Sequence, residues 1–237
     1  MKKSILSLMF IIFLLCGCAT FGPQYHVNID SLSSNNAQSL KTYILLPGNK
    51  DISPDDLQFQ EFSQYINRAL TAKGFTLADD IEKAELAIFL GYGIGDPQEH
   101  LYSYSIPTYG QTGISSASTY GSINTYGNFG SYSSTTTYTP TYGVTGYTSH
   151  MGSIVTYFRY ILLTAFDLDE YRESQKEIQV WKTTITSTGS SGDLRQVFPV
   201  LVGAAREHMG TNTGQQIKII LGESDKRVLE IKNINNE

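Results

Sequence analysis

The chain is poor in cysteine and has no apolar run long enough to cross a membrane as a helix. Cys16 and Cys18 are its two cysteines, and both lie near the amino terminus. The apolar stretch Ile5–Leu15 has only eleven residues, whereas a membrane-spanning helix needs about 20. A basic start at Lys2 and Lys3, followed by this short apolar centre, indicates a secretory signal peptide instead.

The leader ends in Leu15-Cys16-Gly17-Cys18, which resembles the lipobox of bacterial lipoproteins. The resemblance implies cleavage after Gly17 and acylation of Cys18. A metal or redox fragment is the other interpretation of the Cys-x-Cys spacing, but the rest of the chain supplies no further cysteine. Ala19 follows the cysteine in place of aspartate. By resemblance to Gram-negative lipoproteins, this residue favours the outer membrane, on either its periplasmic or its surface face.

We therefore expect residues 1–17 to be a lipoprotein signal peptide and residues 18–39 to be a lipidated terminus and tether. After cleavage Cys18 is the only cysteine, so no intramolecular disulfide can form. Each CH₂ of an acyl chain that is buried in the membrane contributes about 0.8 kcal/mol. One chain therefore gives only marginal membrane binding, whereas two or three chains anchor the protein stably. The membrane is thus the first expected partner, through acyl chains on Cys18.

Positive charge is also scarce. The formal net charge of the chain is −5, and the loss of Lys2 and Lys3 with the leader makes it two units more negative. A basic footprint for phosphate backbones is missing, which argues against nucleic acid as a partner. The sequence likewise offers no polybasic segment that would add electrostatic attraction to anionic lipid.

One long segment lacks charge altogether, since residues 101–158 contain no Asp, Glu, Lys or Arg. Tyr, Gly, Ser and Thr fill 37 of the 50 positions from 101 to 150, which predicts a low-complexity insert over residues 100–153. Two interpretations stay open: a disordered or loosely folded loop, or an extended segment. Low charge and high β-propensity also make the insert prone to self-association. In an extended strand, four tyrosines spaced six residues apart would share one face: Tyr120, Tyr126, Tyr132 and Tyr138.

Tyrosine is the enriched side chain with binding potential in this insert. Its ring offers a flat apolar face and a hydroxyl at a low cost in conformational entropy, which suits contact with carbohydrate or protein. We expect the partner to be an envelope protein or a glycan. The candidate binding surface comprises Tyr109, Tyr120, Tyr126, Tyr132, Tyr138 and Tyr142.

Outside the insert, the apolar pattern predicts one domain over residues 40–235 of class α+β. Its expected architecture is a two-layer sandwich, with a mixed or antiparallel sheet and two helices on one face. A charged turn is expected at 168–176. The expected helices cover residues 55–73 and 194–209, and the expected strands cover 41–47, 84–95, 157–167, 177–186, 217–221 and 227–231.

The order of these blocks resembles bacterial lipoproteins that carry an uncharacterised envelope domain of unknown function. The resemblance rests on "KTYILLPG" (41–48), "AELAIFLGYGIGDP" (84–97) and "WKTTITSTGSSGDLRQVFPVL" (181–201). It extends over nearly all of the chain after the leader. None of the blocks is a catalytic signature, so the resemblance implies a cell-envelope location and an α+β domain, and says nothing of chemistry.

Motifs for catalysis or cofactor binding do not emerge from the sequence. The glycines of "GYGIGDP" (91–97) lead into the insert rather than into a helix, unlike a dinucleotide-binding loop. The four histidines, His26, His100, His150 and His208, are not spaced as a helical zinc pair. A G-x-S-x-G nucleophile elbow is missing as well. We therefore predict no enzyme activity, no metal and no cofactor beyond the covalent lipid.

The predicted role is that of a lipid-anchored, non-catalytic binding or scaffolding module in the cell envelope. The alternative is that the tyrosine-rich insert acts as an adhesive, glycan-contacting or self-assembling surface segment.

Replacement of the acylated cysteine tests the predicted anchor. Cys18→Ser should release the protein from membranes, because the hydroxyl cannot carry the thioether-linked lipid. Fractionation of cells into membrane and soluble fractions measures this release. Cys16→Ser is the matched control and should leave the protein in the membrane fraction, whereas membrane attachment of the Cys18→Ser protein would contradict the prediction.

Overall fold

The structure is a computed structural model that describes residues 22–126 and 129–233, although the side chains of residues 125–130 lie outside this description. The predicted signal peptide and Cys18 also lie outside it. The chain forms two compact units. Of the described residues, the first unit contains 22–98 and 155–233, and the second contains 99–126 and 129–154.

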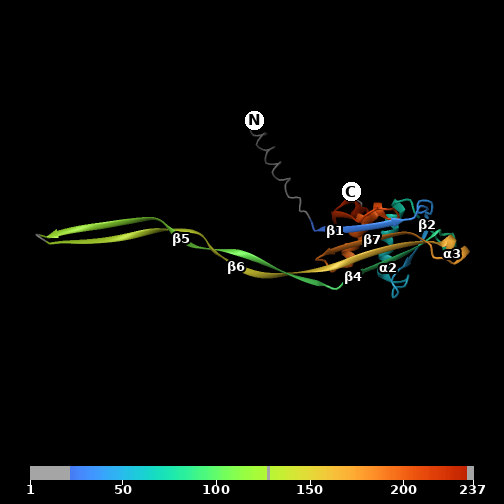
Figure 1. The fold of residues 1–237 in the computed structure, drawn as a ribbon, viewed down its shortest axis with the longest axis horizontal. Coiled ribbons are helices and arrows are strands. Elements are labelled where there is room, and N and C mark those ends of the chain that lie inside the picture. Colours follow the sequence, from blue (N-terminus) through green and yellow to red (C-terminus); the bar gives the residue numbers. More distant parts are fainter. Residues whose placement is uncertain (1–21, 127–128, 234–237) are drawn as a thin grey trace, which may run out of the picture. The chain divides into compact units, whose positions relative to one another are not determined.

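The first unit is built on one mixed sheet (Figure 1). Its strand order is β3-β2-β4-β6-β7-β1-β8. β2 pairs in parallel with β3 and β4, and the remaining neighbours are antiparallel. Only the last part of β6, from Tyr157, pairs with β4 and β7. The strands are β1 (Gln24–Ser33), β2 (Thr42–Pro47), β3 (Thr76–Leu77), β4 (Leu86–Ile94), β6 (Phe129–Asp167), β7 (Gln179–Gly189) and β8 (Ile217–Gly222).

Three helices pack together over one face of this sheet, which we call the inner face. They are α2 (Leu57–Ala72), α4 (Leu194–Ala205) and α5 (Lys226–Lys232), and each contacts the other two. Alternate residues of the central strands point into this core, as period-two side chains do, for example Leu86, Ile88 and Leu90 of β4. At its centre the rings of Phe62 and Phe198 stack with their centroids 3.8 Å apart.

An aspartate begins each of the four α-helices in the described part of the chain. Asp56 accepts a hydrogen bond from the Phe59 amide at 2.9 Å, and the side chains at 167, 193 and 225 cap α3, α4 and α5 in the same way. Such a cap satisfies a backbone donor that the helix itself cannot pair. α2 ends before Gly74, whose φ of +80° is easily reached by glycine.

The predicted helix at 55–73 and most of the predicted strands are confirmed, with ends that differ by a few residues. The predicted strand at 227–231 is wrong, because this segment is helix α5 with Val228 and Ile231 buried. The predicted turn at 168–176 is instead helix α3 (Leu168–Ser174). Residues 24–33, predicted to belong to a tether, form strand β1 between β7 and β8.

The fold is therefore mixed α+β with an open, strand-rich sheet. This confirms the predicted fold class, α+β. The predicted two-layer sandwich with two helices on one face is wrong. Three helices cover the inner face, while α3 and the 3-10 helix η1 (Ile81–Lys83) flank the opposite, outer face. The outer face carries the alternate side chains of the same strands, such as Ala87 and Phe89 of β4.

The second unit is a two-stranded hairpin made by β5 (Gln98–Tyr126) and the first part of β6. Figure 1 shows the two strands running side by side along this unit. The Thr145 hydroxyl donates to the Thr108 carbonyl at 3.2 Å, and Ser122 and Ser133 bond through their hydroxyls at 3.2 Å, which establishes the antiparallel pairing. Of the two interpretations that the sequence left open, the extended one describes this segment.

Truncation of the stacked core ring tests the packing on the inner face. Phe62→Ala should lower the free energy of unfolding by about 3–5 kcal/mol, because it removes a fully buried ring and leaves a cavity. Urea denaturation followed by Trp181 fluorescence measures the change. Leu57→Ala on the same helix is the matched control. Leu57 is 81% exposed, so its loss should change stability by less than about 0.5 kcal/mol.

Candidate functional site

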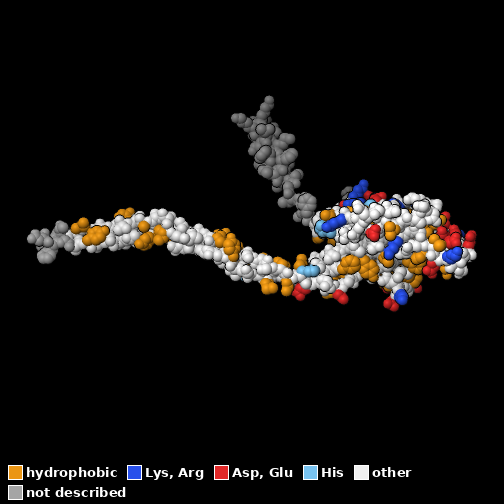
Figure 2. Space-filling model, in the orientation of Figure 1, with side chains coloured by type: hydrophobic (Ala, Val, Ile, Leu, Met, Phe, Trp, Pro, Cys, Tyr) orange, Lys and Arg blue, Asp and Glu red, His pale blue; other side chains and the backbone are white. Residues whose placement is uncertain are grey.

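The tyrosines predicted as a binding surface are exposed on the hairpin. Figure 2 shows its visible face with hydrophobic and uncharged side chains. The side chain of Tyr126 lies outside the described residues. The exposed fractions of the other five rings are 74% for Tyr109, 77% for Tyr120, 65% for Tyr132, 59% for Tyr138 and 74% for Tyr142.

Tyr120 and Tyr132, which were predicted to share one face, lie on opposite faces. Side chains that bond across two strands lie on the same face, so the 3.2 Å contact between Ser122 and Ser133 places these two residues together. Tyr120 lies two residues before Ser122 and shares its face, whereas Tyr132 neighbours Ser133 and lies on the opposite face. The single-face arrangement is therefore wrong, because it treated the insert as one strand while the chain folds back between β5 and β6.

The hairpin has no core of its own. In residues 99–124 and 131–154, where side chains are described, none is buried. Ring contacts inside it are few and occur near the start of β5, where Tyr104 stacks on His150 at 5.6 Å and lies 6.0 Å from Tyr102. The exposed tyrosine rings can therefore contact a partner, and the ring of Tyr132 also lies over Gly121 of the facing strand.

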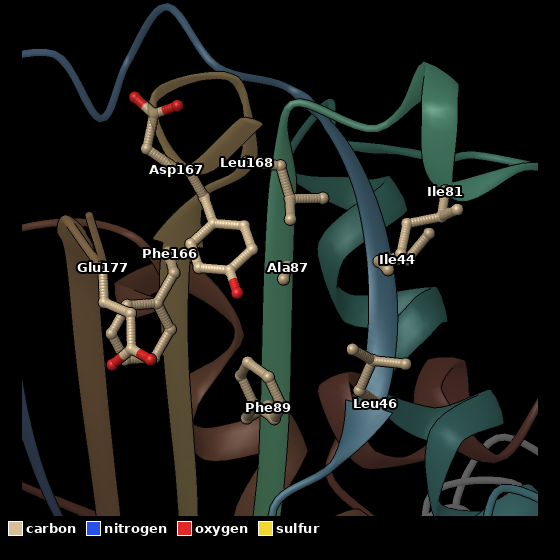
Figure 3. Close-up of a pocket in the computed structure, with 10 residues that line it drawn as sticks. Ile44, Leu46, Ile81, Ala87, Phe89, Phe166, Asp167, Leu168 and Glu177 are labelled. Atoms are coloured by element: carbon tan, nitrogen blue, oxygen red, sulfur yellow. The ribbon is translucent and has the colours of Figure 1, made fainter. Parts of the chain in front are cut away.

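A second candidate surface lies on the outer face of the sheet in the first unit, and sequence patterns did not reveal it. A cavity of about 410 Å³ opens between β2, β4, β6 and α3 (Figure 3). The rings of Phe89 and Phe166 meet edge to face in its wall, with centroids 5.8 Å apart. The cavity is lined by Ile44, Leu46, Ile81, Ala87, Phe89, Phe166, Asp167, Leu168, Tyr171 and Glu177.

A neighbouring hollow of about 500 Å³ continues this surface along the sheet and shares Phe89 and Phe166 with it. We call the two together the outer-face groove. The hollow adds Leu162 and Thr164 of β6, together with the turn after β2 that includes Asn49 and Lys50. The amide group of Asn49 holds this turn against β4, because its Oδ1 accepts from the Tyr92 amide and its Nδ2 donates to the Tyr92 carbonyl, each at 3.0 Å.

The polar groups beside the groove have structural roles rather than catalytic geometry. Asp167 caps α3 by accepting from the Glu170 amide at 3.0 Å, and Asp169 forms an ion pair with Arg172 at 2.6 Å. The carboxylates that follow β6 are therefore engaged by helix α3. The groove is suited to holding an apolar group, with Glu177 as a polar group in its lining.

Titratable groups with shifted pKa values also support the fold. Hydrogen bonds from the Thr42 amide and then from the Lys41 amide, each 2.8 Å long, lower the pKa of the Glu85 carboxyl. Burial and a 2.6 Å hydrogen bond to Glu223 raise the pKa of Tyr25 to about 12. These groups tie neighbouring segments of the first unit together.

Arg159 is a buried cation that donates hydrogen bonds to neutral groups. It is 1% exposed and donates to the Ser191 carbonyl at 3.2 Å and the Ser187 hydroxyl at 3.3 Å. Burial lowers the pKa of its guanidinium. The "STGSSGD" segment that it holds leads to α4, where Asp193 accepts from the Arg195 and Gln196 amides. This segment therefore caps the helix.

Among the described residues, no group of three or more His, Cys, Asp and Glu side chains could hold a metal ion. None of the helices within 22–126 and 129–233 is long and apolar enough to span a membrane.

Comparisons with known proteins give no family. No protein-family model matches the chain, and no curated protein matches it. Among solved structures it is similar to a PDZ domain protein from Parabacteroides distasonis ATCC 8503, with 11% identity and a TM-score of 0.38, over 83% of this chain and 38% of that chain. It is also similar to the lysenin pore, with 8% identity and a TM-score of 0.12, over 84% of this chain and 48% of that chain. The chain thus spans less than half the length of either.

Removal of a wall ring tests the apolar character of the groove. Phe89→Ser should weaken binding of the neutral dye Nile red about tenfold, because loss of a half-buried ring removes about 1.4 kcal/mol or more of apolar contact. Dye fluorescence titrated against protein measures the affinity. Ile220→Ser removes an exposed apolar side chain from β8 and serves as the control. Equal binding by wild type and both variants would contradict an apolar site here.

Proposed function

We propose that this protein is a lipid-anchored, non-catalytic binding or scaffolding module of the cell envelope, held at the outer membrane through acyl chains on Cys18. The observation that supports the binding role is the outer-face groove, which is apolar and is not covered by a helix as the inner face is. The lipobox and the basic, apolar leader support the anchor.

The construction of the groove favours a protein partner. Its walls are aliphatic and aromatic side chains held on sheet strands, so they form a preorganised surface. Apolar surface that stays open to solvent is characteristic of interaction sites in soluble domains. The expected partner is an envelope protein that inserts apolar side chains between Leu46, Phe89 and Phe166. Nucleic acid remains an unfavourable partner for a chain with a net charge of −5.

A second candidate function belongs to the hairpin. We propose as the alternative that it is an adhesive, glycan-contacting or self-assembling surface. The supporting observation is that 50 described residues of strand present exposed rings and hydroxyls with none of their side chains buried. Exposed tyrosines stack readily on sugars and on other aromatic rings.

Capture of partners from membranes separates the two candidates. The full-length protein, crosslinked in its own membranes, should retain its envelope partners when residues 101–150 are replaced by an Asn-Gly turn, because the groove is intact. A two-residue turn can connect the two shortened strands because their ends are adjacent, with Gly152 close to the Tyr102 ring. Phe89→Ser in the intact chain should reduce capture instead. Partner loss on deletion, with capture unaffected by Phe89→Ser, would assign the function to the hairpin.

A further inference from the structure

The hairpin leaves both of its strand edges unpaired. In the described part of the chain, β5 pairs with β6 alone, and β6 pairs with β4 and β7 only from residue 157 onward. Each strand in residues 99–154 therefore directs one row of amides and carbonyls toward its partner strand and the other row outward. An outward row of this kind is a template for a further strand.

Burial of side chains contributes little to the stability of the hairpin. A two-stranded hairpin is marginally stable by itself and gains independent stability from a third strand or from packing against another layer. Here the described side chains of the unit are all at least partly exposed. Hydroxyl pairs such as Thr119 with Thr136, at 2.9 Å, connect the two strands but bury little apolar area. An added strand would supply the missing contacts.

The edges also lack the usual protection against pairing. Proteins commonly block a free edge with lysine or another charge, but residues 101–158 contain none. Proline interrupts each strand once, at Pro107 in β5 and at Pro140 in β6. In a two-stranded ribbon proline fits where its nitrogen faces outward, so each proline blocks its edge locally. The stretch of β5 from Thr108 to Tyr126 is left open.

We propose that this hairpin pairs edge to edge with the same hairpin of a second copy of the chain. The inference rests on the hairpin alternative given under Proposed function and names its partner. A second copy supplies an uncharged edge of the same length and the same pattern of serine, threonine and tyrosine. Paired strands lie about 4.8 Å apart, which brings exposed rings such as Tyr120 and Tyr132 against side chains of the adjoining copy. Exposed rings thereby gain contacts that a single hairpin does not give them.

Introduction of like charges into the hairpin of the full-length protein tests this pairing. Ser116→Lys with Thr135→Lys places one lysine on each strand, on the same face, at exposed positions. In detergent, light scattering coupled to gel filtration should show assembly of the wild type and at least a tenfold fall in the assembled fraction of the lysine variant. Gln215→Lys with Gln216→Lys adds the same charge to exposed positions of the first unit and should assemble as the wild type does.

Rescue distinguishes direct pairing from damage to the hairpin. Ser116→Glu with Thr135→Glu should also prevent assembly alone, and an equal mixture of the lysine and glutamate variants should assemble again, because opposite charges then meet across copies. A monomeric wild type, unchanged assembly of the lysine variant, or no rescue in the mixture would overturn the proposal. This assay does not measure the capture of groove partners or the dependence of that capture on Phe89. A negative result for hairpin pairing therefore leaves the groove proposal standing.

Discussion

The packing of three helices against one face of a mixed sheet is the constraint from which the first unit takes its form. The stacked rings of Phe62 and Phe198 join α2 to α4, and Tyr92 of β4 meets Phe62 edge to face with centroids 4.9 Å apart. Because side chains alternate along each strand, burial of one set against the helices commits the next set to the outer face. The same strands that build the core therefore also build the groove. The position of the groove is determined by the packing of the core.

The two units satisfy their backbone groups in different ways. In the first unit, most of the sheet is paired on both sides of each strand, and polar links such as Glu85 to the Lys41 and Thr42 amides hold its connections. In the second, two strands pair with each other and depend on hydroxyl contacts between their side chains. Burial stabilises the first unit, whereas the second has exposed rings and two unpaired edges. The difference follows from composition, because serine, threonine and glycine bury little apolar area.

Much of the first unit was predictable because its strongest elements carry unambiguous periodicity. The helical spacing of Phe59, Phe62 and Ile66 and the glycine after α2 located that helix. Segments with short or mixed patterns were misassigned. "RVLEI" is compatible with a strand or a helix, and the deciding signal was the aspartate cap at 225. β1 alternates apolar and polar residues, but its buried positions include Ser31, which weakened the pattern.

The candidate sites show why surfaces are harder to predict than elements. The groove gathers residues from β2, β4, β6 and α3, so its lining is scattered from Ile44 to Glu177 and becomes contiguous only through the strand order. The tyrosines were recognised from composition, but their faces depend on where the chain reverses, and a reversal between β5 and β6 converts an even spacing into opposite orientations. For the hairpin, absence of charge is the informative feature. It leaves nothing to repel an identical edge, while the lack of buried side chains means that additional stability must come from outside the hairpin.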